Sequence, residues 1–329
     1  MTNIDYREFD RQIWEEELED FVPSLVYDMH THMWSEEHKG QSVASGLRWG
    51  IDYQDHLAWA AKLYPGREIH YLVLGTPIVG IDIEGHNDWM AAQMVADSAS
   101  AVNLLVVPEM SPEYVSEQVR ENGFLGLKPY RSFAPDPANG RIRDFLPEPF
   151  IEVAHDLGLA ITLHLSKKTG PADPDNLKDL EHYTHKYPRA QWILAHCGRA
   201  FNSFMLEQSI QRLKDMPNIW YDTSAVNDMY SHYLLMKHED RKRVMFGSDN
   251  VAAGCVRGKY VTYGKAWQYF EGFPELTHCD PNATFVIYEQ LRQERQVAEI
   301  LGLSRDEIED HFSGNAIRFI NQVRSARTS

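Results

Sequence analysis

Histidines that follow short apolar runs are the residues of this sequence best suited to chemistry. His30 and His32 end the run LVYDMHTH, while His164 follows AITL and His196 follows WILA. Asp249 comes directly after VMFGS. Neutral imidazoles and carboxylates are ligands that zinc and similar divalent cations favour. The pattern predicts a metal site, provided that the fold brings these side chains together.

Eight short apolar runs predict the strands that position these residues. They are 24–28, 69–75, 102–107, 124–128, 160–165, 192–196, 219–222 and 244–248. Stretches long enough for a helix separate most of them, such as 112–121, 148–157, 174–187 and 204–215. Strictly alternating strands and helices imply parallel strands joined by right-handed crossovers. Eight such units favour a closed (β/α)₈ TIM barrel, with an open doubly wound α/β sheet as the alternative.

The remaining segments fit one TIM-barrel domain that covers residues 1–329. The connections 33–68, 78–100, 131–147 and 251–283 are long, which predicts βα-loop insertions over the carboxyl face of the barrel. Residues 1–22 read as a helical extension before the first strand. Residues 284–329 are strongly helical and are expected to pack on the barrel as extra C-terminal helices.

In such a barrel, the histidines and Asp249 lie at the carboxyl ends of strands one, five, six and eight and converge on its mouth. Packing alone does not explain why these polar residues occur at strand ends, because burying so many polar groups without partners costs free energy. Side chains two apart on a strand share a face, so Asp28 is expected to point the same way as His30 and His32. Lys128 ends the fourth strand and is predicted to point to the same mouth, as a substrate-binding cation or a carbamylated bridge between two metals. The alternative is a lysine that reaches solvent or pairs with a carboxylate.

Composition narrows the partners and the compartment. The chain has 329 residues with 32 Lys and Arg against 48 Asp and Glu, a formal net charge of −16, which disfavours nucleic acid. There is no apolar run of about 18 residues for a membrane span and no secretory pattern at the start. The three cysteines, Cys197, Cys255 and Cys279, form no CxxC motif, so a cytoplasmic protein is expected. A homo-oligomer is the default expectation, because symmetric dimers are common.

The order of these residues resembles the amidohydrolase superfamily of metal-dependent barrels. That pattern is HxH after strand one, often Lys after strand four, His after strands five and six, and Asp after strand eight. The matching residues here are His30, His32, Lys128, His164, His196 and Asp249. The resemblance spans about residues 24–320. The segment HFSGNAIRFI at 311–320 is similar to the closing helix of the amidohydrolase 2 branch.

The resemblance implies a ligand set. One divalent cation is held by His30, His32, His164 and Asp249, and His196 stands beside it as an acid/base group. Zinc is the expected metal and manganese the alternative, with a second metal only if Lys128 is carbamylated. Lys128 and His196 are the residues expected to contact such a second metal or the substrate. The branch contains hydrolases, lactonases and non-oxidative decarboxylases of aromatic or muconate-type acids.

These residues lead to a hypothesis about the reaction. Asp249 and His196 are the predicted catalytic residues, acting with a water whose pKa the cation lowers. Tyr130, Arg131 and Arg199 follow the same strand ends and are predicted to contact a small acidic substrate, although the arginines could instead pair with loop carboxylates. The first expectation is hydrolysis of an amide, ester or lactone. Metal-dependent decarboxylation and a barrel without catalysis are the alternatives.

Overall fold

Eight parallel strands follow one another in chain order around the centre of the structure, a computed structural model that describes residues 4–40, 49–250, 253–270 and 277–327. The strands are β1 (Leu25–His32), β2 (Glu68–Leu74), β3 (Ala101–Val106), β4 (Gly126–Pro129), β5 (Ala160–Leu163), β6 (Gln191–Leu194), β7 (Ile219–Asp222) and β8 (Val244–Met245). The chain at and after β8 returns to β1: Met29 N–H donates to the Phe246 carbonyl at 2.9 Å, and Asp249 N–H donates to the His30 carbonyl at 2.8 Å. The predicted TIM barrel is confirmed.

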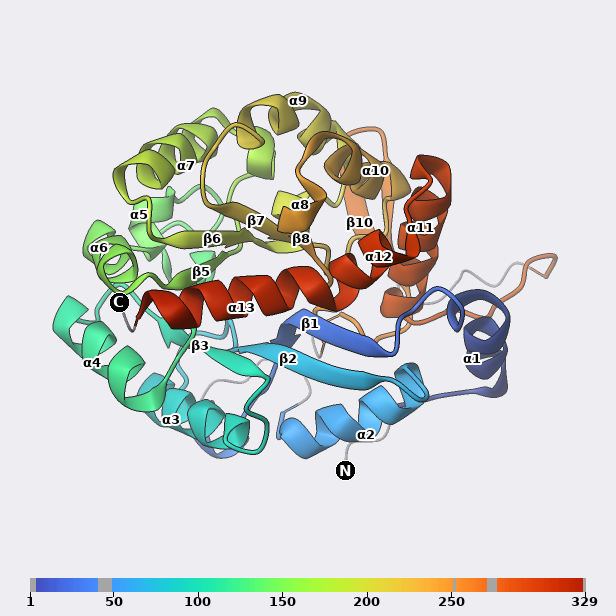
Figure 1. Ribbon diagram of the computed structural model, residues 1–329, viewed down its shortest axis with the longest axis horizontal. Helices are drawn as coiled ribbons and strands as arrows, with labels where there is room; N and C mark the ends of the chain where they lie inside the picture. Colours follow the sequence, from blue (N-terminus) through green and yellow to red (C-terminus); the bar gives the residue numbers. More distant parts are fainter. Residues whose placement is uncertain (1–3, 41–48, 251–252, 271–276, 328–329) are drawn as a thin grey trace.

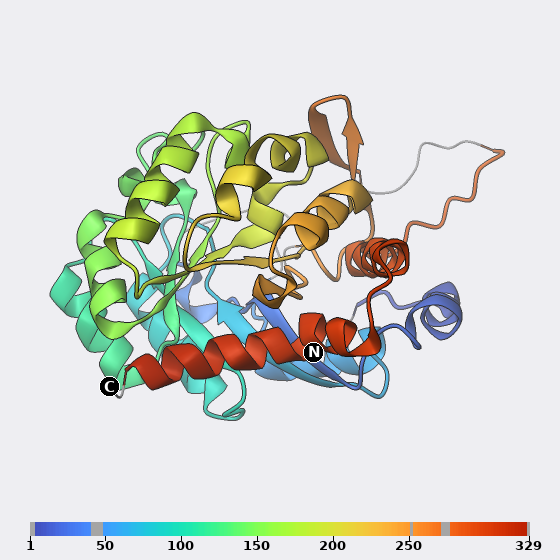
Figure 2. The ribbon, with the colours of Figure 1, turned by 45° about the horizontal axis from the view of Figure 1, so that its top comes forward.

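Helices surround the strands on all sides (Figures 1 and 2). They are α1 (Glu8–Ile13), α2 (Tyr53–Leu63), α3 (Ile83–Met94), α4 (Pro112–Asn122), α5 (Ile142–Phe145), α6 (Glu148–Leu157), α7 (Pro174–Lys186), α8 (Ala195–Arg199), α9 (Ser203–Leu213), α10 (Met229–His238), α11 (Val286–Leu301), α12 (Arg305–Glu309) and α13 (Asn315–Ala326). Local signals set many of these ends. Ser111 caps α4 by accepting from Tyr114 N–H, and Gly158 ends α6 with φ 64°. Within the described ranges, no helix has the length and apolar character that crossing a membrane requires.

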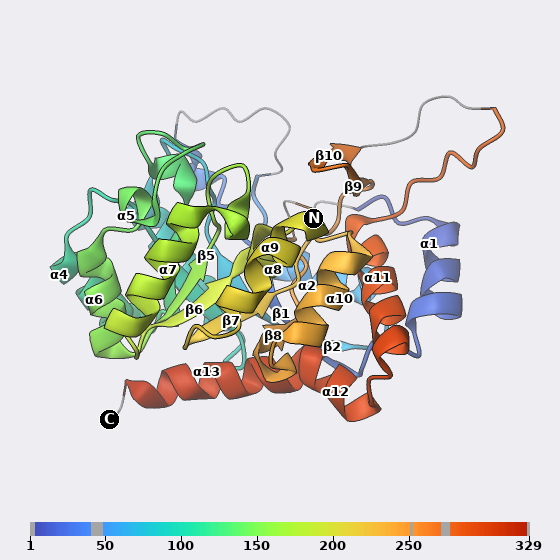
Figure 3. The ribbon, with the colours of Figure 1, turned by 90° about the horizontal axis from the view of Figure 1, so that it is seen from above.

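Helix α13 covers the amino ends of the strands. Asn315 Nδ2 donates to the Val244 carbonyl at 2.8 Å, where β8 begins, and Arg324 donates to the Ser100 carbonyl at 2.9 Å, just before β3. Phe319 and Ile320 pack into the same apolar cluster as side chains from the strands. Figure 3 shows α13 along one end of the barrel and the hairpin of β9 (Lys259–Tyr263) and β10 (Ala266–Phe270) projecting at the opposite end. The carboxyl ends of the strands are therefore the end left for a site.

Strands β5, β6 and β8 end earlier than the apolar runs predicted, whereas β1 and β4 end later. His164 lies one residue beyond β5, His196 two residues beyond β6, and Asp249 four residues beyond β8. The register of β1 against β2 also shifts between Asp28 and Thr31. Because the pleat is interrupted there, strict alternation does not hold along β1, and Asp28 turns to Ser248 rather than to the mouth of the barrel.

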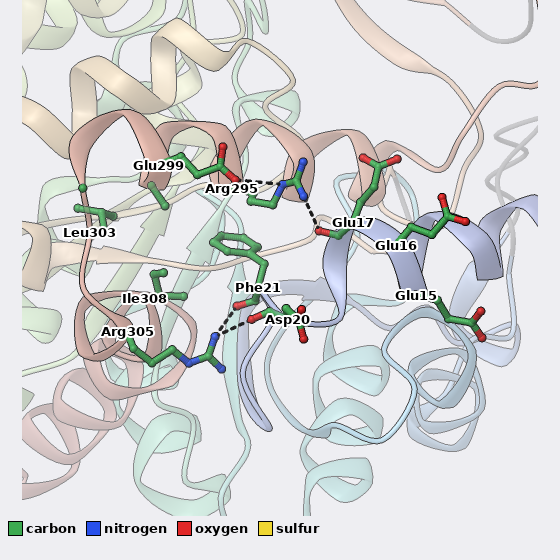
Figure 4. A pocket seen from close by; sticks show the side chains of 12 residues that line it. Glu15, Glu16, Glu17, Asp20, Phe21, Arg295, Glu299, Leu303, Arg305 and Ile308 are labelled. Atoms are coloured by element: carbon green, nitrogen blue, oxygen red, sulfur yellow. Dashed lines mark hydrogen bonds and ion pairs between the residues drawn. The ribbon is translucent and has the colours of Figure 1, made fainter.

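A surface groove of about 450 Å³ lies between the N-terminal segment and α11–α12 (Figure 4). Phe21, Leu303 and Ile308 line it together with several carboxylates. Arg305 donates to the Asp20 carbonyl at 2.9 Å and so ties the two walls together. The residues that line this groove include no histidine or cysteine, and they come from the outside of the barrel. The groove is therefore not the place where the sequence predicts chemistry.

Candidate metal centre

A cavity of about 460 Å³ opens at the carboxyl ends of the strands. Its lining consists of His30, His32, Trp34, Pro77, Lys128, Tyr130, Arg131, Ser132, Pro137, His164, His196 and Asp249. These side chains come from β1 and β4 and from the segments that follow β1, β2, β4, β5, β6 and β8. Chain segments more than 200 residues apart thus meet in one cavity, of a volume suited to a small molecule.

Three of these residues offer ligand atoms that lie within 4.8 Å of one another, namely His30, His196 and Asp249. Asp249 Oδ1 is 3.6 Å from His30 Nε2 and 3.1 Å from His32 Nε2. The aspartate therefore stands next to both histidines of the HxH pair. Two imidazoles and a carboxylate in this proximity match the donor types that zinc-like cations bind.

Each of the four histidines uses Nδ1 to contact an acceptor behind it. The acceptors are Asp222 Oδ2 at 2.8 Å from His30, the Gly75 carbonyl at 3.0 Å from His32, the Leu165 carbonyl at 3.1 Å from His164 and the Ser224 carbonyl at 3.0 Å from His196. A carbonyl oxygen can only accept, so Nδ1 carries the proton in the last three rings. Nε2 is then left with a free lone pair, the form in which imidazole binds a metal.

His164 lies beside this group rather than within it. Its ring centroid is 5.1 Å from that of His196, and it is outside the trio that shares the 4.8 Å separation. The resemblance had assigned His164 to the cation and His196 to proton transfer. His196 comes close to His30, with ring centroids 4.7 Å apart, because α8 begins with a left-handed turn in which His196 has φ 59°.

Burial and neighbouring charges set the protonation states of the centre. Burial lowers the pKa of His30 to about 3, and that of His164 falls well below its ordinary value for the same reason. Burial on its own raises the pKa of Asp249, but the adjacent imidazoles of His32, His196 and His30 lower it to about 2. Neutral imidazoles and an ionised carboxylate are the states that a divalent cation requires.

Asp222 is a residue of the centre that the sequence reasoning missed. It ends β7, is fully buried, and accepts from His30 Nδ1 at 2.8 Å and from the His196 main-chain N–H at 3.0 Å. Burial raises its pKa, but the charge and hydrogen bond of His30 outweigh this effect and hold the pKa below the usual range. The signal in the sequence was an aspartate that ends the apolar run IWYD, as His196 ends the run 192–196.

Lys128 is fully buried and lines the cavity, so it does not reach solvent. Its Nζ has no hydrogen-bond partner among the described residues and lies 4.8 Å from the centroid of the Tyr130 ring. Burial lowers the pKa of this amine to about 8, against the opposing charges of Asp222 and Asp249. The protonated form of this amine can bind an anion, and its neutral form can react with carbon dioxide.

The predicted substrate contacts lie in different places. Tyr130 donates to the Gly75 carbonyl at 2.6 Å and is 3.4 Å from His32 Nδ1. Arg131 lines the cavity and donates to the Pro137 carbonyl at 2.7 Å. Arg199 donates to the Lys167 carbonyl and is not among the lining residues. Within the described part of the chain, neither arginine forms an ion pair with a carboxylate, which was the alternative role for both.

Aromatic side chains adjoin His196 on the side of the β9–β10 hairpin. The Phe201 ring centroid is 5.3 Å from that of His196, and the Trp267 and Tyr260 rings lie 4.6 Å and 4.8 Å from Phe201. The hairpin thus holds two aromatic residues against a third that touches the centre. Phe201 was not singled out from the sequence, because a phenylalanine five residues after a candidate ligand carries no distinguishing spacing.

Comparisons with known proteins agree with this architecture. The amidohydrolase family model (Amidohydro_2) matches residues 27–321. A comparison with curated protein sequences gives no significant match. Among solved structures, 4-oxalomesaconate hydratase from Rhodopseudomonas palustris is 16% identical with a TM-score of 0.59, over 92% of this chain and 98% of that chain.

Two further structures have the same fold. A dihydroxybenzoic acid decarboxylase from Polaromonas sp. JS666, with bound manganese and the inhibitor 2-nitroresorcinol, is 14% identical with a TM-score of 0.58, over 91% of this chain and 97% of that chain. Amidohydrolase 2 from Bifidobacterium longum subsp. infantis is 17% identical with a TM-score of 0.54, over 91% and 99% of the respective chains. At these identities, the likeness establishes the fold alone.

Proposed function

Since this chain belongs to the amidohydrolase family, we propose that it is a metal-dependent hydrolase that cleaves an amide, ester or lactone bond in a small acidic substrate. One observation carries the proposal. The site histidines direct Nδ1 to acceptors behind them, which leaves Nε2 free beside the ionised carboxylate of Asp249. A constellation of this kind is organised to receive a cation rather than to fill a core.

The distances support His30, His32 and Asp249 as ligands of the cation. Two roles remain, a further ligand of the cation and the group that transfers a proton, and they belong to His164 and His196. The resemblance assigns His164 to the cation and His196 to proton transfer, whereas the 4.8 Å separation supports His196 as a ligand. Zinc is proposed because the donor set is rich in nitrogen. Manganese is the alternative, since the Polaromonas decarboxylase holds that metal.

A divalent cation, when bound, supplies Lewis acidity to the reacting carbonyl and its water. Asp249, ionised at neutral pH, accepts a proton from water as the water oxygen attacks the acyl carbon. The leaving nitrogen or oxygen takes a proton as its bond to that carbon breaks. His196, whose Nδ1 is held by Ser224, offers Nε2 to carry this proton.

The cations around the cavity support an acidic substrate. Lys128 and Arg131 line the cavity, and neither pairs with a carboxylate in the described part of the chain. In a chain of net charge −16, a buried amine and a guanidinium left without counter-ions stand out as groups for binding an anion. Arg199 lies near enough for its charge to interact with that of Arg131: burial and Arg131 lower the pKa of Arg199 to about 10.

Decarboxylation of an aromatic acid is the second candidate, and one observation favours it. Trp34 and Tyr130 place aromatic rings in the cavity lining, which suits a ring-bearing substrate. In that reaction the carboxylate lies near the cation, carbon dioxide leaves, and an acid of the site protonates the ring carbon. The same polar residues serve both reactions, so the products must distinguish them.

The proposal is tested by measuring two products on one set of substrates. The metal-loaded protein is incubated with lactones, esters and amides that carry a carboxylate, and with hydroxybenzoates. Acid release and carbon dioxide release are recorded in parallel. We expect acid release without carbon dioxide, abolished in Asp249→Asn. Carbon dioxide from the hydroxybenzoates alone would establish the second candidate, and no turnover of any substrate by the metal-loaded protein would contradict both.

A further inference from the structure

Gln290 on α11 is a fully buried side chain that joins two segments of the barrel. Its Oε1 accepts from the Ala225 main-chain N–H at 2.8 Å, and its Nε2 donates to the Gly247 carbonyl at 2.9 Å. Ala225 follows β7 and Gly247 follows β8. One amide from the outer layer of helices thus connects the chain beyond two neighbouring strands.

Both of these segments carry parts of the metal centre. Ser224, the residue before Ala225, contacts His196 Nδ1 through its carbonyl at 3.0 Å and its hydroxyl at 2.9 Å. Asp249 lies two residues after Gly247. Ala225 and Asp249 both have a left-handed backbone, with φ 57° and 58°, which residues other than glycine seldom adopt. Contacts from outside must therefore hold these segments in shape.

Glu294, one helical turn further along α11, fixes which way the Gln290 amide points. It accepts from Gln290 Nε2 at 3.0 Å, and an ionised carboxylate cannot donate in return. Burial raises the pKa of Glu294, but the nearby His311 imidazole outweighs this effect and lowers it. His311 Nε2 lies 3.5 Å from Glu294 Oε2. The amide nitrogen is therefore directed to Gly247 and the amide oxygen to Ala225.

We propose that Gln290 is a positioning residue that holds His196 and Asp249 in place in the metal centre, with Glu294 setting the orientation of its amide. The inference rests on the proposed function, because it concerns the same cation. Gln290 does not line the cavity, so it acts through the main chain at Ala225 and Gly247 and not by contact with metal or substrate.

Asn315 provides a matched control at the opposite end of β8. Its Nδ2 donates to the Arg241 and Val244 carbonyls, both at 2.8 Å. Gln290→Met and Asn315→Leu each keep the size of the side chain and remove two hydrogen bonds to the main chain. Both variants are expected to lose thermal stability, whereas only the first disturbs the carboxyl end of the barrel.

The decisive measurement is the dissociation constant for zinc, obtained by competition with a chromophoric chelator. Gln290→Met is expected to raise it about 10- to 100-fold, the range typical of residues that support metal ligands. Asn315→Leu is expected to leave it within about twofold, inside ordinary context effects for remote sites. The visible absorption of the cobalt-loaded protein should change in Gln290→Met and match the wild type in Asn315→Leu.

Glu294→Gln keeps the proposal falsifiable if Gln290→Met does not fold. It retains the shape of the side chain but lets the Gln290 amide turn over, so a smaller rise in the dissociation constant is expected. Equal zinc affinities in the Gln290 or Glu294 variant and the Asn315 control would overturn the positioning role while leaving the proposed function intact. Failure of the wild-type protein to bind any divalent cation would overturn both.

Discussion

The suitability of the four site histidines as metal ligands depends on the acceptors of Nδ1 as well as on the positions of the rings. Three of the Nδ1 contacts are to main-chain carbonyls, and only His30 faces a carboxylate, that of Asp222. A carboxylate behind a ligating imidazole increases its basicity and fixes its orientation. His30 is therefore the imidazole of this centre with the strongest support as a metal ligand.

Arg131 offers a test of the substrate class at a single residue. Its guanidinium lines the cavity and contacts only the Pro137 carbonyl among the described acceptors, so a substrate carboxylate can reach it. Arg131→Met is expected to raise KM about tenfold for a carboxylate substrate, which corresponds to about 1.4 kcal/mol, with little change in kcat. The measurement is steady-state kinetics on that substrate and on its neutral methyl ester.

The neutral ester serves as the internal control for Arg131. Its KM should be the same in the variant and the wild-type protein. A tenfold rise for both compounds would show that the substitution alters the cavity in general and would remove the argument for an acidic substrate.

The sequence predicted which polar residues lie at strand ends, but it did not predict the contacts between residues of different strands. His30, His196 and Asp249 each follow an apolar run, and the structure brings them within 4.8 Å of one another. Asp222 and Phe201 were missed because their importance lies in contacts with residues distant in sequence or set by a turn. Asp222 contacts His30 across 192 positions, which no local pattern records.

At the scale of elements, apolar runs predicted which strands exist better than where they end. The runs at 160–165 and 192–196 continue past the last paired residues, Leu163 and Leu194. An apolar side chain beyond the ladder still packs, so hydrophobicity does not mark the last hydrogen bond. Helix α6 spans the predicted 148–157 and ends at Gly158 in the left-handed conformation.

Gly247 provides a test at the end of β8. A Cβ added there would lie 2.9 Å from His30 Cβ, closer than packed carbon atoms come, and 3.3 Å from Ser224 Cβ, a tight contact. Gly247→Ala is expected to displace His30, to lower the free energy of unfolding by about 1–3 kcal/mol and to weaken zinc binding at least tenfold. Urea unfolding and chelator competition measure the two effects.

Gly302 supplies the control for this substitution. It ends α11 with φ 61°, and an added Cβ there would contact nothing within 4 Å. Gly302→Ala should therefore cost about 1 kcal/mol of stability through backbone strain, with no change in zinc affinity. Unchanged zinc affinity in Gly247→Ala would show that His30 can move without loss of the cation.

At the scale of the whole molecule, one end of the barrel is covered by a helix and the other end holds the cavity. Helix α13 covers the amino ends of the strands, at the end opposite the β9–β10 hairpin (Figure 3). The cavity is lined by residues at the carboxyl ends of the strands. The sequence predicted a helical tail packed on the barrel, but not which end it covers. That placement depends on side chains such as Arg324 reaching a main-chain carbonyl more than 200 positions away.

Buried neutral histidines predict that the metal-free protein loses stability in acid. Burial lowers the pKa of His30 to about 3 and those of His56 and His86 to about 4, from an ordinary value of 6.5. Between pH 6.5 and 4 the unfolded chain therefore binds more protons than the folded chain, so the free energy of unfolding falls as the pH falls. Burial raises the pKa of Asp28 to about 7. This one carboxyl group has the opposite effect on the free energy of unfolding.

His86 allows the acid destabilisation by a buried histidine to be tested away from the metal centre. It lies on α3, stacked on Trp89, and its Nε2 has no hydrogen-bond partner among the described residues. His86→Phe should reduce the slope of unfolding free energy against pH by up to about 1.4 kcal/mol per pH unit between pH 6.5 and 4. Urea unfolding at several pH values measures the slope. An unchanged slope would mean that His86 is accessible to protons in the folded state.

Elemental analysis of the purified protein, beside a His30→Ala variant shown to be folded, tests the central claim most directly. The account predicts about one equivalent of zinc or manganese per wild-type chain and almost none in the variant. A value near two would instead indicate that Lys128 bridges a second cation. A folded wild-type protein that takes up no divalent cation when supplied with zinc and manganese, or a His30→Ala protein that retains the wild-type metal content, would contradict the account.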